Sequence, residues 1–154
     1  MHENDVRRVS RAIEVYRLTG RTQREQAAMD AAREGDYDEK LFVLSWSRET
    51  LYRRIDARVD YMLQMGLVDE VRRLHSDEAN HPTALQAIGY KEIVAALDGA
   101  ISMAEAVAMV KQLSRNYAKK QMTWFRRDPR SIWIEAEGRS ADSIADEILS
   151  KSED

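Results

Sequence analysis

The chain has 154 residues, of which 44% are hydrophobic, and a formal net charge of −3, values that suit one compact domain with a core. It has no cysteine, which excludes disulfides, thiol nucleophiles and thiolate metal sites, and its three histidines are too scattered to form a ligand set. It also has no run of about 18 apolar residues and no signal-peptide pattern at its first residues, so we expect a cytoplasmic protein without a membrane anchor.

The N-terminal 38 residues predict two helices. Apolar residues recur at helical spacing from Val6 to Tyr16, with Asn4 or Asp5 as N-cap and Gly20 just after the end. Residues 22–33 are rich in helix formers but carry a thin apolar stripe, so this second helix needs a partner. Residues 35–38 then read as a loop.

Residues 41–46 form a short apolar run without polar alternation, which predicts a strand buried on both faces, as in a parallel sheet. A helix with Ser47 as N-cap follows and ends at Gly66, and a second short helix continues through Leu74. Residues 76–82 predict a loop. Thr83 is placed to cap a helix that runs to Leu97 and is interrupted by Gly89.

A long helix opens with the capping box of Ser102 and Glu105 and ends at Asp128-Pro129. A short strand over 132–134 and an amphipathic helix from Ser140 complete the chain. The two strands cannot form a stable sheet unaided, so we expect further strands to be encoded upstream. The buried side of the long helix is predicted to comprise Met103, Ala106, Val107, Val110, Leu113, Tyr117, Gln121 and Trp124.

Charge is strongly segregated within the C-terminal third. Residues 111–130 carry seven cations and a single acid, whereas residues 131–154 carry seven acids and two bases. A basic face is a candidate polyanion site, although a solvated helix surface is the more common meaning of charge alone. One stripe of the long helix holds Lys111, Arg115, Lys119, Met122 and Arg126, and a second holds Asn116, Lys120, Thr123 and Arg127.

These stripes predict a nucleic-acid face, because phosphates need several donors and nucleobases stack on aromatic rings such as Tyr117 and Trp124. The alternative keeps at least one of these two rings in the core, which we expect. We further expect few local acids to neutralise the cations, since the acids lie in the C-terminal tail. Gly89 is placed either to admit a ligand closely or to allow a kink.

Three strings resemble, in order and at similar spacing, signature segments of the bacterial tRNA dimethylallyltransferases. They are NDVRRVSRAIEVYRLTG (residues 4–20), LQAIGYKE (residues 85–92) and SRNYAKKQMTWFR (residues 114–126), and the likeness runs over nearly the whole chain. The resemblance implies transfer of a dimethylallyl group from its diphosphate to the exocyclic amine of the adenosine beside the anticodon. It also implies Mg²⁺ as cofactor and a base flipped into a channel.

By this resemblance, Arg115 stands at a diphosphate contact and three segments contact the tRNA anticodon stem-loop. The family commonly has Gln at the position of Arg7 and Arg at those of Lys91 and Lys120, so bidentate contacts are lost at the last two. The implied tRNA contacts are Arg7, Arg8 and Arg11, then Gln86, Gly89, Tyr90 and Lys91, and finally Lys119, Lys120, Gln121, Thr123, Trp124 and Arg126.

The family's glycine-rich phosphate loop, which ends in Lys-Ser/Thr, and the Asp taken as general base have no counterpart in these residues. We therefore expect the C-terminal half of a family member, with no catalytic residue, no metal ligand and no transferase activity of its own. Met1 would then be an internal methionine or a truncation point.

The implied fold is α/β and mostly helical, with residues 1–38 as helices of the inserted tRNA-binding domain. Residues 39–154 would be the C-terminal part of a P-loop-kinase-like core with two short parallel strands. The complete enzyme is expected to be a monomer that binds tRNA and dimethylallyl diphosphate and no membrane. The alternatives are a non-catalytic RNA-binding module and, third, a purely helical interaction protein whose basic stripe is only surface.

Overall fold

The computed structural model describes residues 5–32, 39–77 and 83–153. The chain divides into two compact units, Met1–Glu39 and Lys40–Asp154, and each is described by itself. The boundary predicted from the sequence, between residues 38 and 39, lies one residue earlier. The assignment of the first unit to an inserted tRNA-binding domain stays a prediction.

The first unit contains the two predicted helices, α1 (Val6–Thr19) and α2 (Gln23–Ala32). Asp5 caps α1 by accepting a hydrogen bond from the backbone N–H of Arg8, and Gly20 ends it with a φ of +69°. No residue of α1 is buried, and α1 packs against α2. The predicted loop at residues 35–38 lies outside the described residues.

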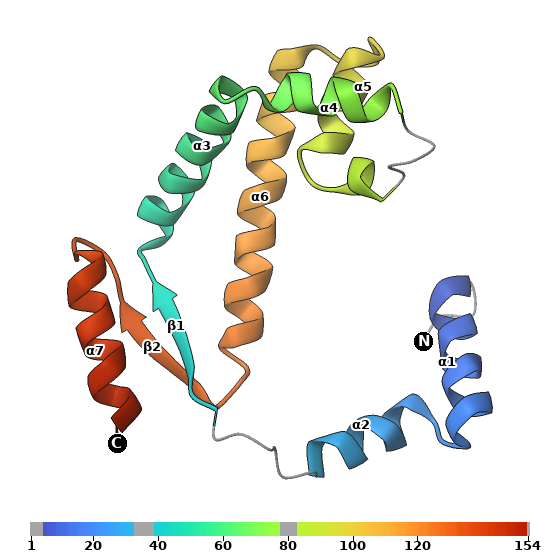
Figure 1. Ribbon diagram of the computed structural model, residues 1–154, viewed down its shortest axis with the longest axis vertical. Helices are drawn as coiled ribbons and strands as arrows, with labels where there is room; N and C mark the ends of the chain where they lie inside the picture. The colour runs from blue at the N-terminus through green and yellow to red at the C-terminus, as the bar shows by residue number, and fades with distance from the viewer. Residues whose placement is uncertain (1–4, 33–38, 78–82, 154) are drawn as a thin grey trace. The chain divides into compact units, whose positions relative to one another are not determined.

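The second unit contains both predicted strands, β1 (Leu41–Ser45) and β2 (Ser131–Glu135). They pair with each other in parallel, in a register that runs from Leu41 opposite Ser131 to Ser45 opposite Glu135 (Figure 1). The crossover between them consists of helices, as parallel pairing requires. The expected fold class is therefore confirmed, and the pairing of these two strands with each other is an addition from the structure.

Two helices follow β1, as predicted: α3 (Arg48–Gln64) and α4 (Leu67–His75). Ser47 caps α3, and its own backbone N–H donates to Glu137, which follows β2. Thr50 also donates its hydroxyl to Glu137, at 2.5 Å. The hydrogen bonds from Thr50 and Ser47 hold the pKa of Glu137 below its ordinary value, so a charged carboxylate joins the end of β2 to the start of α3.

The single helix expected from Thr83 to Leu97 is wrong. A 3₁₀ turn, η2 (Ala84–Gln86), is followed by a separate helix, α5 (Tyr90–Leu97). Gly89 separates them because its φ of +99° is incompatible with a helix interior, and its N–H donates to the buried carboxylate of Glu92 at 2.8 Å. Thr83 makes no side-chain capping bond.

The main core lies where α4 and α5 pack together, and it is centred on Leu67, Val71 and Ile93. The long helix α6 (Met103–Phe125) has the predicted capping box of Ser102 and Glu105 and contacts both α5 and α3 (Figure 1). Its buried residues, Ala106 and Val110, lie in its first half. The second half of α6 is therefore the less covered part, and it carries most of the candidate site.

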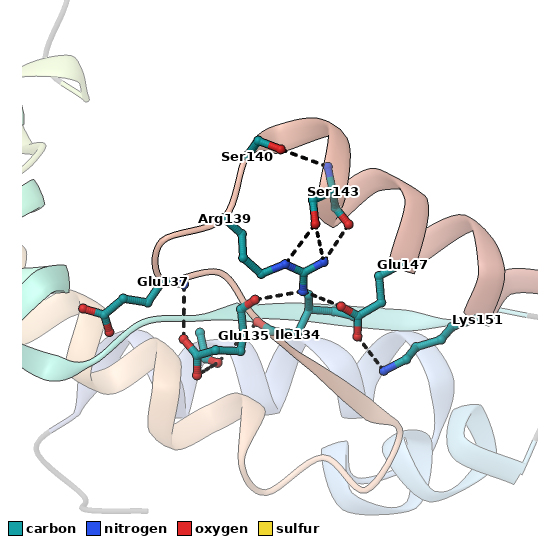
Figure 2. Close-up of polar contacts among 9 residues, drawn as sticks. Ile134, Glu135, Glu137, Arg139, Ser140, Ser143, Glu147 and Lys151 are labelled. Carbon is teal, nitrogen blue, oxygen red and sulfur yellow. Dashed lines mark hydrogen bonds and ion pairs between the residues drawn. The ribbon is translucent and has the colours of Figure 1, made fainter.

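The last helix, α7 (Ala141–Glu153), is attached to β2 through Arg139 (Figure 2). The Arg139 guanidinium donates to the carbonyl of Glu135 at 3.1 Å and to the carbonyl and hydroxyl of Ser143 at 2.6 and 3.0 Å, and it pairs with Glu147. Lys151 pairs with the same carboxylate at 2.8 Å. This network accounts for both bases of the acidic tail as structural residues.

Candidate nucleic-acid interface

Four cations of the second half of α6 and the turn after it are exposed and form no ion pair with any described residue. This group, named the α6 cation cluster, consists of Lys119, Lys120, Arg126 and Arg127. Unpaired cations close together repel one another, so their arrangement suits an anionic partner.

The expectation of few local acids is wrong for the other two cations of the same stripe. Lys111 pairs with Asp60 at 2.6 Å, and Arg115 pairs with Asp56 at 2.5 Å, so two rungs connect α6 to α3. The acids come from α3, one helical turn apart, and the sequence did not show which helix would lie beside α6. The stripe is thus divided into a paired half and an unpaired half.

Arg115 is the more enclosed member of these rungs, with 22% of its side chain exposed. It also donates to the side chain of Gln112 at 2.9 Å and lies 6.0 Å from the ring centroid of Tyr52. A guanidinium has five donors, so these contacts leave capacity for a further anion. They also fix its position.

The expectation that Tyr117 or Trp124 would lie in the core is wrong for both. Tyr117 is 56% exposed and Trp124 is 61% exposed, whereas Met122 and Phe125 are half-buried. The reason is that the covered face of α6 changes along its length: α5 covers its first half, and the last turns face β1 and α3. Gln121, another residue expected on the buried side, is exposed as well.

The exposed aromatic rings and part of the cation cluster share one groove of about 630 Å³. Ile88, from the loop before α5, lines the groove together with residues of α6. The structure therefore brings the second and third segments of the resemblance together. The groove residues that matter here are Ile88, Tyr117, Lys119, Lys120, Trp124 and Arg127.

The predicted contact residues of the second segment differ in their exposure to solvent. Gln86 and Lys91 are exposed, and Gly89 is buried. Tyr90 donates its hydroxyl to Glu70 at 2.5 Å, and this hydrogen bond raises the pKa of Tyr90. Of the third segment, Thr123 lines the groove and donates its own hydroxyl to the carbonyl of Lys119.

The three predicted arginines of α1 lie in the first unit. Arg8 pairs with Asp5 at 3.3 Å and Arg11 pairs with Glu14 at 2.8 Å, both within the helix. Arg7 is exposed and has no ion pair with a described residue. Exposed pairs of this kind contribute little stability and exchange readily with water, so all three arginines remain accessible to an anion.

Sequence reasoning missed the cations that α3 presents. Arg58 lines a hollow of about 330 Å³ between α3 and α6, beside Tyr117 and Gln121. Arg48 lies at another hollow, close to Lys119 and Arg126. The signal was available in the sequence, since Arg48, Arg54 and Arg58 recur on α3, but only the packing of α3 on α6 shows which of them approach the basic stripe.

No three His, Asp or Glu side chains gather closely enough to hold a metal ion within residues 5–32, 39–77 and 83–153. In those same ranges, no helix is both long enough and apolar enough to cross a membrane.

Comparison with known proteins identifies the family. Residues 1–128 match the family model described as IPP transferase. The chain is 44% identical over 150 residues to the tRNA dimethylallyltransferase of Desulforamulus reducens. The matched region covers 97% of this chain and 53% of that protein. It is 40% identical over 152 residues to the enzyme of the same name from Carboxydothermus hydrogenoformans, covering 99% of this chain and 49% of that protein.

Two solved structures also match this chain. The tRNA delta(2)-isopentenylpyrophosphate transferase of Staphylococcus epidermidis superposes with a TM-score of 0.74 at 41% identity, over 99% of this chain and 50% of that chain. The tRNA isopentenylpyrophosphate transferase of Bacillus halodurans gives a TM-score of 0.72 at 36% identity, over 99% of this chain and 46% of that chain. The chain thus spans about half the length of its curated relatives. The resemblance stated from the three strings is confirmed: the chain belongs to the IPP transferase family.

Proposed function

We propose that this chain supplies the tRNA-binding surface, and one diphosphate contact, of a tRNA dimethylallyltransferase. The reaction is transfer of a dimethylallyl group from dimethylallyl diphosphate to the exocyclic amine of the adenosine 3′ of the anticodon. The observation that carries the proposal is the groove in which unpaired cations of α6 stand beside the exposed Tyr117 and Trp124. Phosphates bind the cations and an unstacked base binds the rings.

The proposed tRNA contacts come from three segments. Arg7, Arg8 and Arg11 of α1 bind backbone phosphates. Gln86 at the end of η2, Gly89 before α5, and Tyr90 and Lys91 at the start of α5 form the second contact segment. Lys119, Lys120, Gln121, Thr123, Trp124 and Arg126 provide the α6 surface. Arg115 binds the diphosphate of the prenyl donor while Asp56 holds its guanidinium in place.

We further propose that the 154 residues alone do not transfer the prenyl group. Transfer needs charge stabilisation on the departing diphosphate and a base for the amine proton. No phosphate-loop string occurs in the sequence, and Arg115 alone is a weak substitute for a cradle of backbone N–H groups. Mg²⁺ would be held by residues outside this chain. The complete enzyme is proposed to be cytoplasmic and monomeric.

The second candidate function is a non-catalytic RNA-binding module, favoured by the absence of that string from these residues. A chimera separates the two. The part of the Desulforamulus reducens relative that this chain does not cover is fused to residues 1–154, and transfer of labelled dimethylallyl groups to tRNA is measured. Transfer by the chimera, absent from the 154-residue chain alone, supports the proposal. A folded chimera that binds tRNA without transfer supports the binding module. Transfer by residues 1–154 alone overturns the proposed inactivity.

A further inference from the structure

Another hollow, of about 230 Å³, shares Lys119 and Thr123 with the groove but is also lined by residues from the start of α3 and by the residue after β1. We name it the Trp46 cavity. Its lining residues include Trp46, Arg48, Tyr52, Lys119, Met122 and Arg126. Because Lys119 and Thr123 line both hollows, an RNA strand that crosses α6 at this point contacts both hollows.

The cavity is basic and has an aromatic wall. Arg48, Lys119 and Arg126 are exposed at it, and none of the described residues that line it is acidic. These cations form no ion pair with a described residue, in contrast to Lys111 and Arg115 farther back on α6. Three cations around one small hollow are costly unless an anion neutralises them, since like charges repel.

Its aromatic residues are held by arginines. The Arg54 guanidinium lies 5.1 Å from the ring centroid of Trp46, and the Arg48 guanidinium lies 5.2 Å from that of Tyr52. Tyr52 therefore positions Arg48 at the cavity rim, and Arg54 supports the indole. Trp46 and Met122 line the cavity, and the Trp46 indole is a flat ring of the kind on which nucleobases stack.

The size of the cavity limits the occupant. It is far larger than the roughly 30 Å³ of a water molecule and smaller than the pockets of about 300–1,000 Å³ that enclose drug-sized ligands. One nucleobase with its phosphate at the rim fits this range better than an extended chain. We propose that the Trp46 cavity binds one unpaired nucleotide of the RNA whose neighbouring segment occupies the groove. Its base lies against Trp46, and its phosphate lies among Arg48, Lys119 and Arg126.

This inference rests on the proposed RNA-binding function, so the test includes variants of both hollows. The affinity of the 154-residue chain for a labelled anticodon stem-loop is measured by fluorescence anisotropy at several salt concentrations. Trp46→Leu should weaken binding about tenfold, the loss expected for one base stack, while Trp46→Phe restores most of it. Arg126→Gln should weaken binding and flatten the log–log salt slope by about 0.7.

Matched controls remove the same groups elsewhere in the second unit. Tyr61→Leu deletes an exposed ring of α3 outside the cavity, and Arg73→Gln deletes an exposed cation of α4. Neither should change affinity more than twofold. If Trp46→Leu and Arg126→Gln bind like the parent chain while Trp124→Leu and Lys120→Gln weaken binding, the cavity is no nucleotide site and the groove still stands. If all four leave binding unchanged, the proposed function falls as well.

A positive signal comes from Trp46 as the sole tryptophan, in the variant with Trp124→Phe and Trp133→Phe. Its emission should be quenched by the stem-loop in proportion to binding, and adenosine monophosphate should quench it only at far higher concentration. Emission unchanged by bound stem-loop contradicts stacking on Trp46. Equal quenching by the free mononucleotide and the stem-loop contradicts a site for a nucleotide within an RNA strand.

Discussion

Replacing Lys111 and Arg115 by glutamine should lower stability while leaving the salt dependence of RNA binding almost unchanged. The Arg115 rung is partly enclosed, with 22% of the arginine and 36% of Asp56 exposed, and a charged hydrogen bond in such a place contributes about 1.5–3 kcal/mol. The Lys111 rung is more exposed at Asp60, so it contributes up to about 1 kcal/mol. The double variant should therefore lose about 1.5–4 kcal/mol.

The assay is urea unfolding followed by far-ultraviolet circular dichroism, with the loss read from the shifted midpoint at a constant slope. A cycle with Asp56→Asn isolates the Arg115 rung, whose coupling should exceed about 0.5 kcal/mol. The matched control is Lys119→Gln with Arg126→Gln, which removes the same charge from the same helix. That control should change stability by less than about 0.5 kcal/mol and flatten the RNA salt slope by about 1.4–1.8. If the Lys111 and Arg115 variant flattened the salt slope and the Lys119 and Arg126 variant lost stability, the division of the stripe into a paired and an unpaired half would be refuted.

Three further predictions concern the fold. Gly89→Ala should destabilise by about 1 kcal/mol or more, seen as a lower urea midpoint, because its φ of +99° strains an L-residue although a Cβ would meet Val110 at only ordinary contact distance. The pKa of Asp128 is lowered from 3.8 to about 2 by its hydrogen bonds with Arg130, so the stabilisation is present above pH 4 and is lost as pH falls from about 4 to 2. Arg130→Gln should return that pKa toward 3.8 in an NMR titration; an unchanged value contradicts the assignment. The chain should associate through the exposed edges of β1 and β2 as its concentration rises in sedimentation velocity, whereas a monomer with a sharp cooperative melt would contradict this.

Local patterns predicted most of the elements because each depends on nearby residues. The capping box of Ser102 and Glu105, the cap at Ser47 and the glycine at 66 all appear as expected. The exception is the segment before α5. There the sequence pattern was helical on both sides of Gly89. Only the positive φ of Gly89 shows that the turn η2 ends before it and that α5 begins after it.

The site was predicted less completely because it depends on which elements meet. The cations of α6 were found from spacing, but their division depends on Asp56 and Asp60 of α3, which lie more than fifty residues away in sequence from their partners Arg115 and Lys111. Likewise, helical period placed Trp124 on the buried side, yet no described element covers it. Trp46 read only as the end of a strand, although it lines a basic cavity.

The most direct test of the account is the affinity of residues 1–154 for a tRNA anticodon stem-loop as a function of salt concentration. The four cations of the α6 cation cluster, each meeting one phosphate, should contribute about −3 to the log–log slope, and charge-neutral variants at these positions should remove that contribution stepwise. A slope near zero, or an affinity that the four substitutions leave unchanged, would contradict the claim that this surface binds RNA.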